Sequence, residues 1–286
     1  MKRVVVLLVS VGLFLSGCNI LNPKDENDHQ VVVFFNTKSL SSSLLKSTAS
    51  EAEKTVEKII IYGVDDNDVV EKLLVEQNPP DGGILLTVSR SIKTFYAIAN
   101  PSAAMEAYDP LSVAALTNMI AYFETAQQSP FLMSGKAGIN GFKVNIELER
   151  VVVKIDIFGM NGFEIQSIEV KNTPDRVFVF DRGGALPTSG LRTDYLPTTS
   201  TTLYVAEYHS SDPTTFLVSG EFEDKQASYN LVIRSAGSAI SLLRNTHYQV
   251  NISPITEDEF EFELIIPDWK DGQPLDDHFI PDDLFE

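Results

Sequence analysis

Short apolar runs separated by turn-forming residues recur along most of the chain. The pattern is clearest over 142–157, where apolar and polar side chains alternate, as in a β-strand with one buried face. The apolar positions fall in two sets of opposite parity: Phe142, Val144, Ile146 and Leu148, then Val151, Val153, Ile155 and Ile157. Because a strand keeps its faces in period two, this change predicts a bulge or a break near Glu149 and Arg150.

Many other segments repeat the strand pattern. The expected strands lie at 30–35, 58–64, 69–75, 84–90, 93–99, 165–170, 176–180, 203–208, 214–222, 228–234, 248–252 and 259–266. In the last of them three apolar residues, Phe260, Phe262 and Leu264, alternate with three glutamates. Many short strands at about ten-residue spacing indicate an all-β chain built of β-sandwiches.

Two segments are expected to interrupt the strands. From Leu111 to Thr125 apolar residues recur at a spacing close to that of a helix, and Asp109-Pro110 is a good helix start, so we expect a helix that covers a sheet edge. Residues 65–68 are three aspartates and an asparagine, which suggest calcium. The calcium-loop signature needs a glycine where this chain has Val70, so we favour a plain hairpin turn and predict no metal site.

The length is sufficient for two domains of ordinary size. We expect an N-terminal β-sandwich domain over 30–160, which holds the one short helical region, and a C-terminal β-sandwich domain over 161–269, with the boundary near Gly159–Phe163. Residues 18–29 are polar and acidic, as in a flexible tether. Residues 270–286 form an acidic tail with interspersed apolar residues and prolines, so a solvated tail and a segment that docks on another subunit both remain open.

The first residues have the composition of an export signal. Lys2 and Arg3 precede an apolar stretch over 4–15, which is shorter than the ~20 apolar residues of an ordinary transmembrane helix. We therefore expect a signal peptide over 1–17.

The only cysteine of the chain follows this signal directly. Leu15, Ser16 and Gly17 precede Cys18, and the pattern resembles the lipobox of bacterial lipoproteins, in which the cysteine is acylated and becomes the mature N-terminus. Several acyl chains, at about 0.8 kcal/mol per buried methylene, make a durable membrane anchor. A plain signal peptide in which Cys18 is incidental is the alternative.

The charge is strongly negative. The chain has 40 acidic and 22 basic residues, a net charge of −18, and loses two of the basic residues with the signal. Such a surface repels phosphate backbones, which argues against nucleic acid as a partner and suits a protein exposed to solvent outside the cell.

No residue pattern indicates an enzyme. The histidines, His29, His209, His247 and His278, do not form a metal-ligand spacing, and the chain has no Gly-x-Ser-x-Gly elbow and no phosphate-binding glycine loop. Glu207 and His209 are expected to share one strand face as a surface pair. We therefore predict no catalytic residues, no enzymatic activity and no cofactor.

The first expected strand is apolar at every central position: Val31, Val32, Val33, Phe34 and Phe35. Such a run is typical of a strand covered on both faces. The segment 37–57 that follows is rich in serine and lysine, so we expect an exposed loop or a weak helix there.

Several motifs together resemble the fimbrillin family of Bacteroidales, the subunits of type V pili. They are the lipobox, the apolar first strand and its Ser/Lys-rich loop, Ser129–Gly135, Leu148–Ile157, Tyr195-Leu196-Pro197 and Leu243–Tyr248. The resemblance covers essentially the whole mature chain. It implies transthyretin-like β-sandwich domains, a location at the cell outer membrane in a fimbrium that serves cell adhesion, and other fimbrial subunits as partners in a homo- or heteropolymer.

The resemblance also implies an assembly mechanism. An extracellular arginine-specific protease removes the lipidated first strand, here Val31–Phe35, and the C-terminal donor strand of another subunit fills the groove. This chain has no arginine between Arg3 and Arg90, and the possible cleavage residues are Lys46, Lys54 and Lys58. Cleavage after one of these lysines fits a stalk or tip subunit, whereas a retained strand fits an anchor. The alternative is a monomeric surface lipoprotein that binds glycan or host protein.

Overall fold

The computed structural model describes residues 28–37, 50–80, 82–123, 127–183, 185, 187, 192–193, 199–208, 213–235, 238–254 and 260–265. The helices are α1 (Glu51–Lys54), α2 (Ala103–Ala107) and α3 (Val113–Thr117). The strands are β1 (Asp28–Thr37), β2 (Lys58–Asp65), β3 (Val70–Gln77), β4 (Ile84–Ser89), β5 (Ile92–Ala99), β6 (Ile120–Tyr122), β7 (Met133–Gly138), β8 (Lys143–Arg150), β9 (Val153–Gly159), β10 (Glu164–Lys171), β11 (Thr173–Pro174), β12 (Arg176–Phe178), β13 (Arg192–Thr193), β14 (Thr202–Val205), β15 (Thr215–Phe222), β16 (Lys225–Leu231), β17 (Arg234–Ser235), β18 (Ser238–Ala239), β19 (His247–Pro254) and β20 (Phe260–Ile265). This predominance of strand over helix confirms the all-β class.

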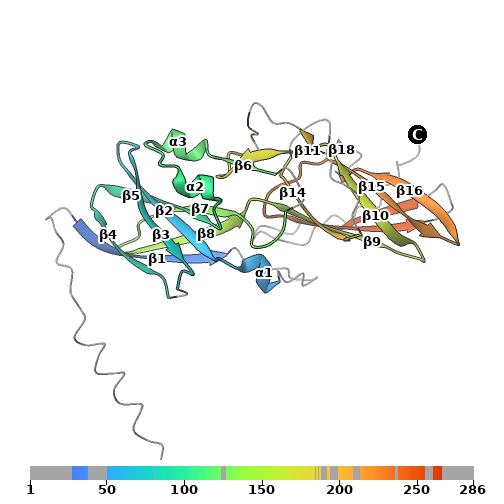
Figure 1. Cartoon of the computed structure of the whole chain (residues 1–286), viewed down its shortest axis with the longest axis horizontal. Helices are drawn as coiled ribbons and strands as arrows, with labels where there is room; N and C mark the ends of the chain where they lie inside the picture. Colours follow the sequence, from blue (N-terminus) through green and yellow to red (C-terminus); the bar gives the residue numbers. More distant parts are fainter. Residues whose placement is uncertain are drawn as a thin grey trace, which may run out of the picture.

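The first half of the chain forms a seven-stranded sheet with the order β3-β2-β5-β7-β8-β1-β4, which lies on the left in Figure 1. One apolar cluster receives side chains from β1, β2, β4, β5, β7 and β8, including Val31, Ile61, Leu86, Phe95 and Ile146. Strands far apart in the sheet order, such as β2 and β4, contribute to this cluster. The sheet therefore curls around it.

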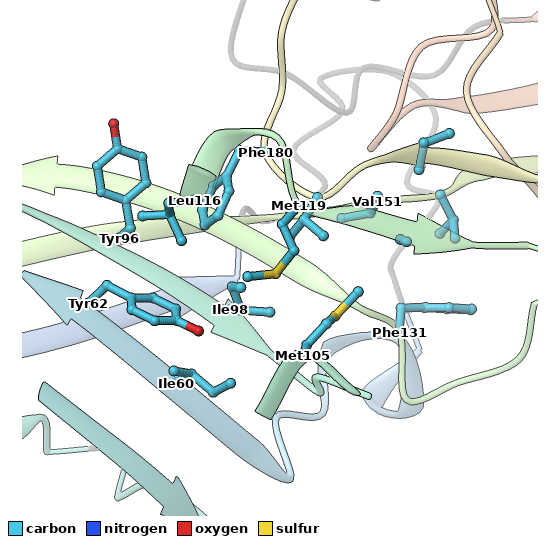
Figure 2. Packing of buried hydrophobic residues seen from close by; sticks show 14 of the residues in the cluster. Ile60, Tyr62, Tyr96, Ile98, Met105, Leu116, Met119, Phe131, Val151 and Phe180 are labelled. Atoms are coloured by element: carbon cyan, nitrogen blue, oxygen red, sulfur yellow. The ribbon is translucent and has the colours of Figure 1, made fainter. Parts of the chain in front are cut away.

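The strands β2 and β5 are buried on both faces. Ile59 and Ile61 face the cluster inside the curled sheet, whereas Ile60 and Tyr62 belong to a second cluster on the other face. Figure 2 shows this second cluster, in which Met105 of α2 and Leu116 of α3 lie beside the side chains of β2 and β5. The double burial explains why β2 is apolar at successive positions.

The helix expected over 111–125 is wrong in its extent. Within the described residues 111–123, helix is confined to α3: the Ser112 side chain accepts the N–H of Ala115 at its start, and Asn118 caps its end. The chain then extends into β6, which pairs antiparallel with β12. This long-range pairing satisfies the backbone groups that a longer helix would pair internally, and it accompanies the burial of Ala121 and Phe123 in the second cluster, so tertiary context overrides the helical spacing.

The predicted break near Glu149 and Arg150 is confirmed. Strand β8 ends at Arg150, Val151 and Val152 are buried outside any strand, and β9 begins at Val153. The two strands lie in different sheets, because β9 pairs with β14 and β19. Strand pairing therefore changes over at Val151 and Val152, earlier in the chain than the expected boundary near 159–163.

The second half of the chain lies on the right in Figure 1. The sheets β14-β9-β19-β20 and β10-β15-β16 both contribute to a third apolar cluster, which includes Ile155, Val218 and Val250. The alternation predicted for the last strand is confirmed: Phe260 and the next two alternate residues of β20 pack against this cluster, and the glutamates between them are exposed.

Candidate functional site

Strand β1 lies inside the seven-stranded sheet, although it is the first strand described. It pairs antiparallel with β4, with Val31 opposite Leu86, and parallel with β8, with Phe35 opposite Ile146. The ladder with β4 covers 28–33 and the ladder with β8 covers 32–37, so β1 bridges the two strands and is paired on both sides where the ladders overlap. Loss of β1 would leave a gap between β8 and β4, edged by unpaired backbone groups.

The two faces of β1 are not buried equally. Val31 and Val33 are fully buried in the cluster enclosed by the sheet, whereas Val32 and Phe34 are half-buried on the outer face. There the Lys143 ammonium lies 6.0 Å from the centre of the Phe34 ring. The expectation that both faces are covered is thus correct only for the inner face.

The possible cleavage residues have different surroundings. Lys54 is the last residue of α1, and Lys58 is the first residue of β2, with its Nζ 2.5 Å from Oε1 of Glu106. Both therefore belong to regular structure. Lys46 lies outside the described residues, as do Cys18, its lipobox Leu15, Ser16 and Gly17, and the acidic tail.

A buried carboxylate in α1 fixes this helix to the body of the protein. Ser50 caps the helix in a capping box with Glu53, whose side chain accepts the backbone N–H of Ser50 at 2.6 Å. Glu53 is only 3% exposed, and its Oε1 accepts the Tyr204 hydroxyl at 2.6 Å and lies 3.0 Å from Nζ of Lys154. We call these contacts, together with the bond from Arg150 described next, the Glu53 junction.

Arg150 completes the junction from the end of β8. Its side chain is 1% exposed, and its Nε donates to the backbone carbonyl of Glu53 at 2.8 Å. Its Nη1 donates to Oδ1 of Asn245 at 3.1 Å. The junction thus joins α1 to strands of both sheet systems and to the loop before β19.

The electrostatics of the junction follow from burial and hydrogen bonding. Burial alone raises the pKa of Glu53, but the bonds from Tyr204, Lys154 and Ser50 outweigh it, so the pKa lies below its usual 4.5. Burial and the Glu53 carboxylate raise the pKa of the Tyr204 phenol. Glu53 is therefore held as a carboxylate and Tyr204 as a neutral donor.

The Leu243–Tyr248 motif has a structural role beside this junction. The Arg244 guanidinium forms a buried ion pair with Glu207, with Nε 2.9 Å from Oε2, and donates to the carbonyls of Phe178 and Val179. The surface pair expected at Glu207 is therefore wrong, since Glu207 is 2% exposed. Its expected partner His209 lies outside the described residues.

A second buried pair follows in the same motif. Nε2 of His247 lies 2.7 Å from Oδ2 of Asp156, whose Oδ1 accepts the Thr202 hydroxyl at 2.6 Å. Burial raises the pKa of Asp156, but the bonds from His247 and Thr202 outweigh it, so the pKa lies below 3.8. The pair links β9, β14 and β19, which are neighbours in one sheet.

The turn at 65–68 has the geometry of an Asx turn: Oδ1 of Asp65 accepts the backbone N–H groups of Asn67 and Val69. Among the described residues, no group of three or more histidine, cysteine, aspartate or glutamate side chains could hold a metal ion. No helix in that part of the chain is long and apolar enough to cross a membrane.

The sequence contained one overlooked signal for the junction. Ser50 and Glu53 have the spacing of a capping box, which marks the start of α1. Arg150, Lys154 and Tyr204 carry no comparable signal, because they meet Glu53 only when the two halves of the chain pack together.

The comparisons with known proteins concern the fold. No protein-family model and no curated protein matches the chain. Among solved structures, the tip fimbrial protein Mfa3 of Porphyromonas gingivalis, with a C-terminal truncation, matches 85% of this chain and 100% of its own at 16% identity and a TM-score of 0.62. A fimbrial assembly protein of Parabacteroides distasonis matches 84% of this chain and 96% of its own at 13% identity and a TM-score of 0.57.

A third similar structure, from Bacteroides eggerthii, is provisionally assigned to cell adhesion. It matches 87% of this chain and 98% of its own at 10% identity and a TM-score of 0.59. At these identities the matches show that the fold is shared. The resemblance to Bacteroidales fimbrial proteins expected from the sequence is thereby confirmed for the fold, over most of the chain.

Proposed function

We propose that the protein is a structural subunit of a surface fimbria, exported as a lipoprotein and assembled with other fimbrial subunits by strand exchange. The position of β1 carries this proposal. The strand occupies an interior slot between β8 and β4, and Val31 and Val33 fill the apolar core behind it. A strand from another subunit with apolar residues at alternate positions would satisfy the same backbone groups and refill the same core.

The shared fold supports this proposal. The similar structures include a tip fimbrial protein and a fimbrial assembly protein, which match most of this chain. We propose two transthyretin-like domains, as the resemblance implies. The pairing of β9 with β14 and β19 favours a boundary at Val151 and Val152.

Acylation of Cys18 would attach the mature protein to the outer membrane, with its body at the cell surface. The tether leads directly to β1, which begins at Asp28, so one cut after β1 would separate the folded body from both its lipid and its first strand. Of the three candidate lysines, Lys46 suits such a cut best. Proteases bind extended chain, and cutting at Lys54 or Lys58 would require α1 or β2 to open first.

The role within the fimbria depends on that cut. A processed chain fits a stalk or tip subunit, and an unprocessed chain with a blocked Cys18 fits an anchor. N-terminal sequencing of protein extracted from the cell surface distinguishes the two. A start at Ser47 supports processing after Lys46.

Strand exchange itself is tested with the mature protein cut between Thr37 and Ser50 by a lysine-specific protease. A fluorescent peptide spanning 30–37 should enter the cut protein and leave the uncut protein unlabelled. A control peptide with aspartate in place of Val31 and Val33 should not enter. Failure of the first peptide to enter, together with absence of polymers in the cut protein, would contradict the proposal.

A further inference from the structure

The two segments on either side of 38–49 are fastened to the body in different ways. Strand β1 is held by backbone ladders to β4 and β8 and by apolar packing. The segment 50–58 is held by buried, charge-assisted hydrogen bonds as well, and none of the partners described below belongs to β1. This difference bears on whether the segment 50–58 stays in place when β1 leaves the sheet.

The Glu53 junction is the first of two fastenings. Its partners Arg150, Lys154 and Tyr204 lie on β8, β9 and β14. The ladder between β1 and β8 ends at Thr37 and Leu148, short of Arg150. The junction therefore keeps its partners when β1 is absent.

Asn100 provides the second fastening, at the end of β5. Its Oδ1 accepts the backbone N–H of Glu57 at 2.9 Å, and its Nδ2 donates to the carbonyls of Thr55 and Phe131 at 2.8 Å. Its own N–H donates to the carbonyl of Lys58, also at 2.8 Å. The chain from Thr55 to Lys58, the first residue of β2, is thus tied to the end of β5.

We propose that the Glu53 junction is a stop that confines strand release to β1. This inference rests on the proposed strand exchange. Once β1 has left, further peeling would pull α1 and its Glu53 away together, and would break the bonds that join Glu53 to Arg150, Lys154 and Tyr204. That loss is costly because hydrogen bonds to a charged group are stronger than neutral ones. The stop protects β2, whose neighbours β3 and β5 depend on it, so the gap between β8 and β4 keeps its shape for an incoming strand.

The test uses the mature protein treated with lysine-specific protease, with the new N-termini identified by mass spectrometry. In the wild-type protein, cutting should stop at a product that begins at Ser47. In Glu53→Gln, which removes the charge but keeps the size, cutting should continue to Thr55 and Ile59. If Glu53→Gln does not fold, Tyr204→Phe serves in its place. It removes one hydroxyl only and should give a partial shift towards the same products.

Hydrogen exchange gives a second readout. In the cut protein, the amides of 53–57 should exchange about tenfold faster in Glu53→Gln than in wild type, the factor expected for one charge-assisted hydrogen bond. Val218→Ala is the matched control, because Val218 is fully buried in the third cluster, to which α1 contributes no residue. It should lower overall stability and leave both the Ser47 product and the amides of 53–57 unchanged.

The stop is overturned if the Glu53→Gln and Tyr204→Phe proteins, once cut, keep the Ser47 product and wild-type exchange, or if Val218→Ala shifts the cutting equally. Neither readout requires the labelled peptide 30–37 to bind. Failure of strand exchange therefore contradicts the proposed function, whereas the cutting and exchange results named above contradict the stop.

Discussion

The central side chains of β1 are all apolar, but they are not equally buried. Val33 is fully buried in the core enclosed by the sheet, whereas its neighbour Val32 is half-buried on the outer face. The perturbation is to shorten each valine to alanine in a peptide spanning 30–37. If β1 occupies the gap with the register described here, the two substitutions should have clearly different effects.

The expected magnitude follows from burial. Val33→Ala removes two methyl groups, each about 0.8 kcal/mol of transfer free energy, and leaves a cavity that adds to the loss, about 2–3 kcal/mol in total. Since every 1.4 kcal/mol is about tenfold in affinity, binding should weaken by roughly 30-fold or more. Val32 gives up only part of its surface to the protein, so Val32→Ala should cost less than about 1 kcal/mol.

The assay is competition. Unlabelled variant peptides compete with the labelled wild-type peptide for protein cut between Thr37 and Ser50, and fluorescence polarisation reports the ratio of affinities. Val31→Ala should behave like Val33→Ala, because the two residues share the inner face. Equal losses for Val32→Ala and Val33→Ala, or a larger loss for Val32→Ala, would refute the register and the one-sided burial of β1.

Three further predictions concern the rest of the chain. Glu207→Ala should lower the free energy of unfolding in urea by about 3 kcal/mol or more, because it leaves the Arg244 guanidinium buried without its counter-charge. Glu169→Gln, at a partly exposed pair with Lys171, should cost less than about 1 kcal/mol. Similar losses for the two variants would count against the buried pair. Cys18→Ala should abolish lipid labelling and release the protein from the membrane fraction, so unchanged labelling would rule out the lipobox. Because the pKa of folded Asp156 lies below 3.8, the stability it contributes is present above that pH and is lost as the pH falls through the folded pKa; Asp156→Asn should flatten this acid dependence of the free energy of unfolding, and an unchanged profile would contradict it.

Local sequence pattern predicted much of the strand content. Alternation located β8 and β20, and the change of parity at Arg150 marked the passage from one sheet to another. These predictions succeed because side-chain parity within a strand is a local property, which the chain cannot change without a break. The helix expected over 111–125 failed because β6 gains its partner from β12, more than fifty residues later in the chain.

The candidate site also combines features that the local sequence predicted with features that depend on distant segments. The apolar run Val31–Phe35 identified β1 as a buried strand from the sequence alone, but its interior slot depends on β4 and β8, which are distant in sequence. Likewise the spacing of Ser50 and Glu53 indicates a helix start, whereas no feature of the neighbouring sequence indicates that Glu53 is buried against Tyr204.

By itself, then, the sequence determined the all-β class, the position of most strands and the apolar character of β1, since these depend on neighbouring residues. Only the tertiary structure decided which face of β1 is buried and that α1 is pinned where the two halves of the chain meet. A buried ion pair or an interior strand exists only when separate segments have excluded water together, and no single segment encodes that event.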